Sequence, residues 1–237
     1  MFGLLAAWQF SYGTPEDSIY GALLFVISNV LDCADGQLAR IQKSGTLFGR
    51  IIDGVADYIV GIAIFIGIGF GFGYMNHEMW IVLVIAGFST AMHAIFFDHY
   101  QNEFISIVRS EKNFLDKEIE QFRNELRIMK TDRRNSVRSI LLIFYLKYLI
   151  VQKGFGKKPD NVQYDSERYK NENSLAIRFW SFIGPTTNRT ILIFFAFLGS
   201  IDVYLWTVLI AGNLWLIFCR IYQSIIEKRM ERISANV

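Results

Sequence analysis

Long apolar stretches separated by short polar ones dominate this chain. Four of the stretches approach or exceed the ~20 residues that a helix needs to cross a bilayer. They cover residues 18–38, 47–74, 79–97 and 203–221. The pattern predicts a transmembrane helix at each of these four positions.

Two further apolar runs are incomplete. Residues 177–198 are interrupted by Gly184 and Pro185, followed by Thr-Thr-Asn, which predicts a break and a fresh helix start. We count this run as a broken or short fifth span. The run over residues 1–12 is too short to span and lacks the basic start and cleavage site of a signal peptide. We expect it to be part of a helix whose beginning lies further upstream.

A polar insertion, residues 99–173, separates the fourth span from the fifth. Its first part predicts an amphipathic helix, because apolar residues recur at spacings of four and three. These residues are Leu115, Ile119, Phe122, Leu126 and Met129. The apolar run 139–151 is too short to span and contains Lys147, so it should pack on that helix or lie at the membrane surface. Residues 154–173 predict a polar loop.

The resulting prediction is an all-α polytopic membrane protein with about six transmembrane helices, the first one truncated. Residues 1–237 would form a single transmembrane domain that carries the cytoplasmic helical insertion. A structural or dimer role for the insertion is the simpler interpretation, and recognition of a substrate is the alternative.

Composition and charge agree with a membrane protein. Apolar residues make up 52% of the chain, and the mean hydropathy is +0.28. None of the 24 Lys and Arg residues falls in the short loops 13–17, 75–78 and 200–202. The positive-inside rule therefore predicts that these loops face away from the cytoplasm. The net charge of +2 is too small to suggest a nucleic-acid partner.

Four aspartates interrupt the second and third apolar runs. They are Asp32, Asp35, Asp53 and Asp57. At about 100° per residue, the pair on each helix falls on one face, so that both pairs can point into one cleft.

Each carboxylate within a membrane span costs about 2.5–3.5 kcal/mol, so four of them need positive charge nearby. Neither helix contains a lysine, and Arg40 and Arg50 at the helix ends cannot neutralise four acids. Hard divalent cations with oxygen ligands can, and Mg²⁺ or Mn²⁺ fits best. A pair of such ions, completed by substrate phosphates, could stabilise the entering and leaving oxygens of a displacement at phosphorus.

Small residues lie beside these acids. Gly36 costs roughly 1 kcal/mol in a helix relative to alanine, which is explained if a ligand must approach the backbone. Gly49 permits the same interpretation, and Ala39 also leaves room, while Arg40 could contact an anionic group of a nucleotide. The alternative is that the glycines serve helix packing, which is common in membranes.

The order and spacing of these residues resemble the motif of the CDP-alcohol phosphatidyltransferase family. The motif is Asp, two residues, Asp-Gly, two residues, Ala-Arg, eight residues, Gly, three residues, Asp, three residues, Asp. It matches eight positions, from Asp32 to Asp57. The insertion and the abbreviated start depart from the family pattern.

The resemblance implies specific roles for the matching residues. Two divalent ions, Mg²⁺ or Mn²⁺, would be held by Asp32, Asp35, Asp53 and Asp57. Asp57 would also be the general base that takes the proton from an acceptor hydroxyl. The nucleotide would be framed by Gly36, Ala39, Arg40 and Gly49. The family further implies a cytoplasm-facing polar cavity and usually a homodimer.

The reaction implied is transfer of a phosphoalcohol group from a CDP-alcohol, with CDP-diacylglycerol favoured as donor, to a hydroxyl acceptor with release of CMP. Headgroup transfer from a CDP-headgroup donor to diacylglycerol is the alternative. A divalent-cation transporter is a rival from another class, and an inactive relative is a third reading. Arg189 and Arg178 are the candidates for binding an acceptor phosphate or carboxylate.

Overall fold

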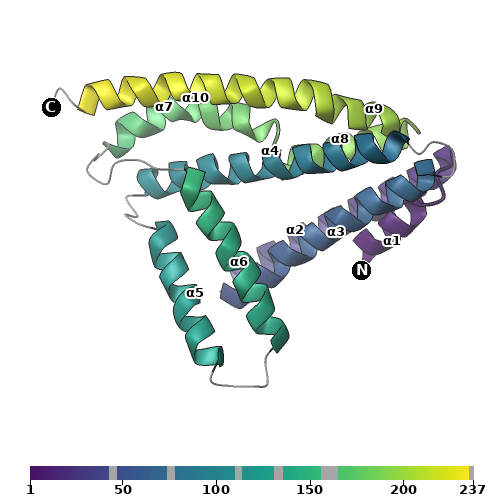
Figure 1. The fold of residues 1–237 in the computed structure, drawn as a ribbon, viewed down its shortest axis with the longest axis horizontal. Helices are drawn as coiled ribbons and strands as arrows, with labels where there is room; N and C mark the ends of the chain where they lie inside the picture. Colours follow the sequence, from purple (N-terminus) through teal and green to yellow (C-terminus); the bar gives the residue numbers. More distant parts are fainter. Residues whose placement is uncertain (43–46, 74–77, 110–113, 131–135, 156–164, 235–237) are drawn as a thin grey trace. The chain divides into compact units, whose positions relative to one another are not determined.

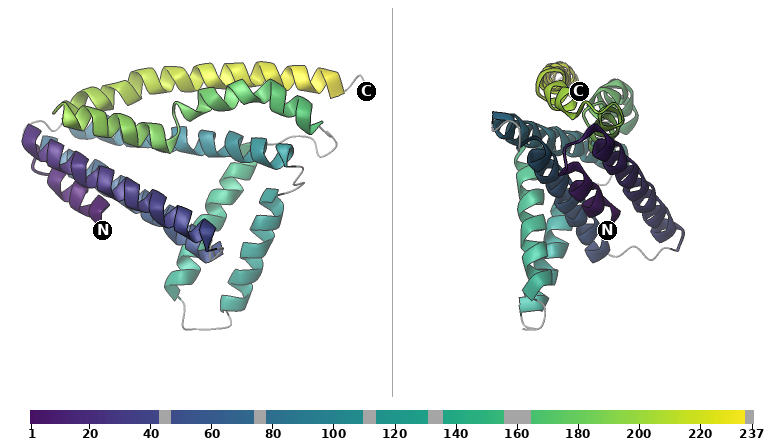
Figure 2. Two further views of the ribbon diagram at one scale, coloured as in Figure 1. Left: turned by 180° about the vertical axis from the view of Figure 1, so that it is seen from behind. Right: turned by 90° about the vertical axis from the view of Figure 1, so that its right-hand side faces the viewer.

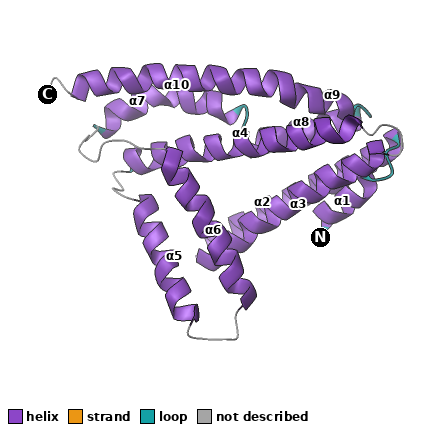
Figure 3. Ribbon diagram, in the orientation of Figure 1, coloured by secondary structure: helices purple, strands orange, loops and turns teal. Residues whose placement is uncertain are grey.

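The fold is helical in every part of the chain that the structure, a computed structural model, describes (Figures 1 and 3). The described residues are 1–42, 47–73, 78–109, 114–130, 136–155 and 165–234. The helices are α1 (Phe2–Phe10), α2 (Pro15–Ile41), α3 (Leu47–Gly73), α4 (Glu78–Val108), α5 (Phe114–Lys130), α6 (Ser136–Phe155), α7 (Ser166–Ser181), α8 (Pro185–Phe197), α9 (Ile201–Thr207) and α10 (Asn213–Ser234), with a π-helical segment, Val208–Gly212, between α9 and α10. The predicted all-α class is confirmed, and no strand occurs in these ranges.

Four helical stretches in the described ranges are long and apolar enough to cross a membrane. They are Pro15–Leu38, Ile52–Phe72, Glu78–Val108 and Ile201–Met230. Each contains or overlaps one of the four spans predicted from the hydropathy pattern. The predicted loop at residues 75–78 lies largely outside the described residues, as 74–77 are not described.

The predicted break in the fifth apolar run is also confirmed. α7 ends at Ser181, and α8 begins at Pro185, whose fixed φ and missing N–H suit the first turn of a helix. α8 has 13 residues, which is too short for a full span.

The contacts divide the chain into two compact units. Unit 1 comprises Met1–Met92 and Pro185–Asn213, and unit 2 comprises His93–Gly184 and Leu214–Val237. α4 passes from the first unit into the second without a break.

In unit 1, the short α1 packs against both α2 and α3 (Figure 2). Glycines on α3 allow this close approach. A Cβ at Gly67 would collide with the backbone carbonyl oxygen of Ala7. The apolar core of the unit includes Ala6 and Phe10 of α1, and both side chains are buried. α1 is therefore an integral part of the packing of unit 1.

In unit 2, α7 begins earlier than the sequence predicts. The polar loop predicted over 154–173 is wrong from residue 166 onward, because Asp165 caps the helix by accepting a hydrogen bond from the backbone N–H of Arg168. One face of α7 is buried at helical spacing. It consists of Tyr169, Asn173, Ala176 and Trp180.

The predicted insertion is also shorter at its start, because α4 continues nine residues past His99, to Val108. Phe104, Ile107 and Val108 pack against a buried cluster formed by α7 and α10. A buried hydrogen bond of 3.0 Å from Gln223 Nε2 to Asn173 Oδ1 also joins α7 to α10. The ends of the insertion thus belong to the helical packing of unit 2.

The central part of the insertion is a pair of helices, α5 and α6, that lie side by side (Figures 1 and 2). Ile119 and Phe122 of α5 are buried, as are Leu142, Leu146 and Leu149 of α6. The ring of Tyr145 packs edge-on against Phe122. The prediction that the second helix packs on the first is confirmed.

Substituting Gly67 by alanine should destabilise the protein, since the new Cβ would collide with the α1 backbone, which cannot move cheaply. We expect a loss of about 1–3 kcal/mol, which lowers the thermal midpoint in detergent by roughly 2–10 °C. Gly61→Ala on the same helix is the matched control, because its Cβ would meet nothing within 4 Å. Equal midpoints for the two variants would contradict the described packing of α1.

Candidate active site

Three of the four predicted aspartates interact in unit 1. Asp32 of α2 interacts electrostatically with Asp53 and Asp57 of α3, and comes within hydrogen-bonding range of Asp53. Two carboxylate groups can share such a contact favourably only with a proton or a cation between them. The two helix faces predicted to share a cleft therefore bring their acids together.

Among the side chains that the structure describes, Arg189 contacts this cluster with a positive charge. Its Nη2 lies 2.8 Å from Asp57 Oδ2, and its Nη1 donates a hydrogen bond of 3.1 Å to Asn29 Oδ1. The side chains of Arg189 and Asp57 are 29% and 39% exposed. Arg189 lies in the first turns of α8, which contacts α2, so its guanidinium joins three helices of the unit.

Asn29 is the residue of this site that the sequence analysis missed. It lies three residues before Asp32, on the same face of α2. Its Nδ2 donates to the carbonyl oxygen of Phe25 at 2.7 Å, which leaves Oδ1 directed to Arg189. A polar amide one turn from an intramembrane acid was the signal that could have indicated it.

Gly36 borders open space. A Cβ at this position would meet nothing within 4 Å, so in this structure the glycine does not serve helix packing. Gly49 is exposed at the start of α3. Ala39 and Arg40 lie in α2, but their side chains are outside the part of the chain that the structure describes.

The remaining two candidates are less closely tied to the cluster. Asp35 is exposed on α2, one turn after Asp32, and its role as a ligand stays a prediction. Arg178 is exposed on α7 of unit 2, and its role in binding an acceptor also stays a prediction.

The donor chemistry of the acidic cluster fits a hard divalent cation, because carboxylate oxygens converge from two helices. Within the described ranges, however, no group of three or more His, Cys, Asp or Glu side chains stands ready to hold a metal ion. Asp57 forms an ion pair with Arg189, which supplies part of the positive charge that the cluster needs. Binding of a cation by all these acids would require side-chain rearrangement.

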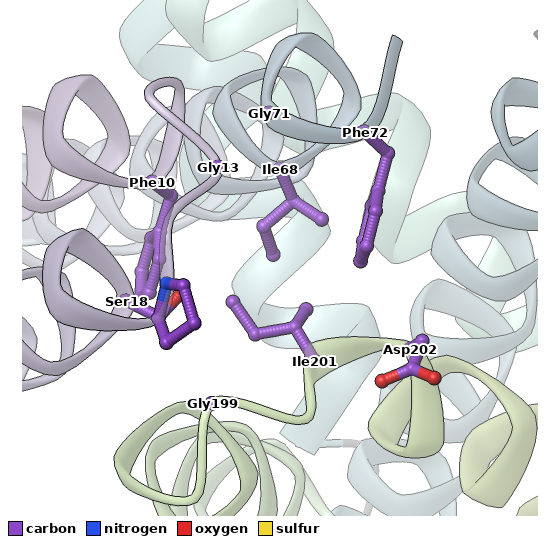
Figure 4. A pocket seen from close by; sticks show the side chains of 10 residues that line it. Phe10, Gly13, Ser18, Ile68, Gly71, Phe72, Gly199, Ile201 and Asp202 are labelled. Atoms are coloured by element: carbon purple, nitrogen blue, oxygen red, sulfur yellow. The ribbon is translucent and has the colours of Figure 1, made fainter. Parts of the chain in front are cut away.

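The predicted cytoplasm-facing polar cavity stays a prediction. One small open pocket of unit 1 is lined by residues of α1, α3 and α9, among others (Figure 4). Phe10, Ile68 and Ile201 point into it, and the Asp202 carboxylate lies at its edge. Eleven residues separate Asp57 from Ile68 on α3, which is about 16 Å at 1.5 Å per residue. This pocket is therefore not the acidic site.

Comparison with known protein families finds a match for the first 111 residues of the chain. Residues 1–111, a little less than half of the 237-residue chain, match the model of the CDP-alcohol phosphatidyltransferase family. It contains all eight motif positions and all four aspartates. The resemblance inferred from the motif is confirmed.

A curated relative from Wigglesworthia glossinidia brevipalpis is named CDP-diacylglycerol–glycerol-3-phosphate 3-phosphatidyltransferase. It is 36% identical to this chain over 66 residues. The match spans 28% of this chain and 34% of the relative, so it covers about a third of that protein. No solved structure matches the chain.

The contact between Asp57 and Arg189 should be measurable as a coupling free energy. In a double-mutant cycle with Asp57→Asn and Arg189→Gln, we expect a coupling of about 1 kcal/mol, because the pair is only partly exposed. Thermal unfolding in detergent with a chelator present would measure it.

The matched control is the pair Arg229 and Glu172, whose arginine side chain is 60% exposed. Their coupling should be close to zero, because water screens exposed pairs. A coupling for Asp57 and Arg189 no larger than that of the control pair would contradict the described contact.

Proposed function

We propose that this protein transfers a phosphatidyl group from CDP-diacylglycerol to a hydroxyl acceptor and releases CMP. The observation that carries the proposal is the convergence of Asp32, Asp53 and Asp57, inside the segment that matches the family model, with Arg189 beside the last of them. Carboxylates that could hold divalent cations, with an arginine beside them, suit the attack of a hydroxyl on a diphosphate.

The proposal includes two divalent ions, Mg²⁺ or Mn²⁺, held by Asp32, Asp35, Asp53 and Asp57. When bound, such ions neutralise a diphosphate and stabilise charge on the entering and leaving oxygens. The mutual contact of carboxylates from two helices supports this part of the proposal. Open space beside Gly36 would leave room for the nucleotide, framed also by Ala39, Arg40 and Gly49.

Asp57 is the proposed general base. Its carboxylate takes the proton of the acceptor hydroxyl as the acceptor oxygen forms a bond to the phosphorus that carries the lipid. The bond from that phosphorus to the bridging oxygen of the diphosphate breaks, and CMP leaves with the electron pair.

Arg189 is the proposed anchor for an anionic group of the acceptor. Its guanidinium already lies 2.8 Å from Asp57, so an anion that it binds would be placed next to the base. To bind that anion, Arg189 would exchange its contact with Asp57 for the substrate. Its hydrogen bond to Asn29 would hold the guanidinium in place during the exchange.

The name of the Wigglesworthia relative favours glycerol 3-phosphate as the acceptor and CDP-diacylglycerol as the donor. A phosphorylated acceptor also agrees with an arginine at the base. Headgroup transfer from a CDP-headgroup donor to diacylglycerol is less favoured, because diacylglycerol carries no anion for Arg189 to bind. We further propose that the site faces the cytoplasm, as the charge distribution predicts, and that the protein is a homodimer.

The test is CMP release by the purified protein with Mg²⁺ and a panel of CDP-alcohols and acceptors. We expect turnover with CDP-diacylglycerol and glycerol 3-phosphate, and a loss of about 100-fold or more in Asp57→Asn because the proton acceptor is gone. Asp202→Asn, an exposed aspartate at the distant pocket, is the matched control and should retain full turnover.

Near-normal CMP release by Asp57→Asn would exclude the assigned base. Turnover with a CDP-headgroup and diacylglycerol instead would select the alternative reaction. Metal flux across liposomes without metal-dependent binding of cytidine nucleotides would favour a cation transporter.

Metal binding can be tested without turnover. Titration of Mn²⁺, followed by electron paramagnetic resonance, should show that Asp53→Asn weakens binding about tenfold or more, since a carboxylate ligand is lost. Chelation should stop CMP release, and added Mg²⁺ should restore it. Mn²⁺ affinity equal in Asp53→Asn and Asp202→Asn would show that the acidic cluster does not hold the ion.

A further inference from the structure

The outer face of α6 is apolar although the helix is not a membrane span. Four of its large apolar side chains are between 39% and 65% exposed, and they are Ile140, Ile143, Phe144 and Ile150. At 100° per residue, these four positions fall within an arc of about 120°. They form an apolar stripe, which Lys147 interrupts between Phe144 and Ile150, and it is called here the α6 stripe.

The α6 stripe is separate from the face that packs on α5. Leu142, Leu146 and Leu149 are 8% exposed or less, and they fall on a different arc of the helix. α6 is therefore apolar on two faces, and α5 covers one of them.

The part of α5 whose side chains the structure describes, residues 119–127, does not share this property. Its exposed described residues are polar or charged, namely Glu120, Gln121, Arg123, Asn124 and Arg127. The two-helix insertion thus has one side suited to water and one side suited to a nonpolar environment. A solvated hairpin would show the polar pattern on both helices.

The charge of α6 and of the residues beside it indicates which kind of nonpolar surface the α6 stripe would contact. α6 contains three basic residues and no acidic residue. Residues 130–158 contain eight Lys and Arg residues and one Asp, a net charge of +7 in a chain whose total is +2. Lys147 is exposed and lies within the arc of the α6 stripe, where its long stem can lie along apolar surface while its ammonium reaches phosphate groups.

We propose that the α6 stripe lies in the headgroup region of the bilayer and binds an anionic lipid surface. α6 is not among the helices apolar enough to cross the membrane, so it would lie along the surface with its stripe buried below the phosphates. The basic residues around it would contact anionic headgroups. The spanning helices of the same chain hold the insertion near that surface, which makes a modest interfacial affinity sufficient.

The experiment uses the full chain in nanodiscs, with the photoreactive residue p-benzoylphenylalanine in place of Phe144. Illumination should give covalent adducts with a labelled phospholipid. The same probe in place of Asn124, on the polar side of α5, is the matched control and should give at least tenfold less adduct. Adding phosphatidylglycerol to phosphatidylcholine nanodiscs should raise the adduct yield at residue 144 severalfold.

A second variant tests the stripe as a unit. With the probe in place of Ile140, the substitution Phe144→Asp should lower the lipid adduct severalfold, because it places a carboxylate among anionic headgroups. Equal lipid adducts at 144 and 124 would overturn the proposal. Adducts at 144 between protein chains would also overturn it, by showing that a second copy covers the stripe. These readouts do not depend on CMP release, so they stand or fall independently of the proposed reaction.

Discussion

The contact between Arg189 and Asp57 is the interaction on which the site depends. Carboxylates on two apolar helices repel one another and resist burial in hydrocarbon, so the fold must supply a cation. Arg189 does so at 2.8 Å, from the first turns of a helix that begins at Pro185. The break before that helix, which disrupts an otherwise apolar run, is what places an arginine beside the acids.

The same contact connects the site to the packing of unit 1. Arg189 reaches Asp57 on α3 and Asn29 on α2, so α8 is tied to both acidic helices. α1 packs against the same two helices, and Gly67 permits its close approach. The positions of the acids thus rest on small residues that allow close backbone contact and on one cation that offsets the repulsion.

The insertion, by contrast, is held by the apolar packing of its helices. Its outer segments are part of the packing of unit 2, because α4 extends to Val108 and α7 begins at Ser166. Its central helices, α5 and α6, pack on each other and leave the α6 stripe exposed. In a chain anchored in a bilayer, such a face has a nonpolar environment close at hand, which a water-soluble protein would lack.

The sequence alone determined the helical class, the four long apolar spans and the aspartate motif. These features follow from local composition and from helical periodicity, which need no knowledge of distant contacts. The helix break before Pro185 was also predicted from neighbouring residues alone. The tertiary structure decided that Asp57 contacts Arg189, 132 positions later in the chain, and that Asn29 joins them. Only folding brings α8 against α2, so spacing along the sequence could not reveal these partners. α7 was misjudged for a related reason: its helix is polar overall, and the buried face that fixes it is visible only against α4 and α10.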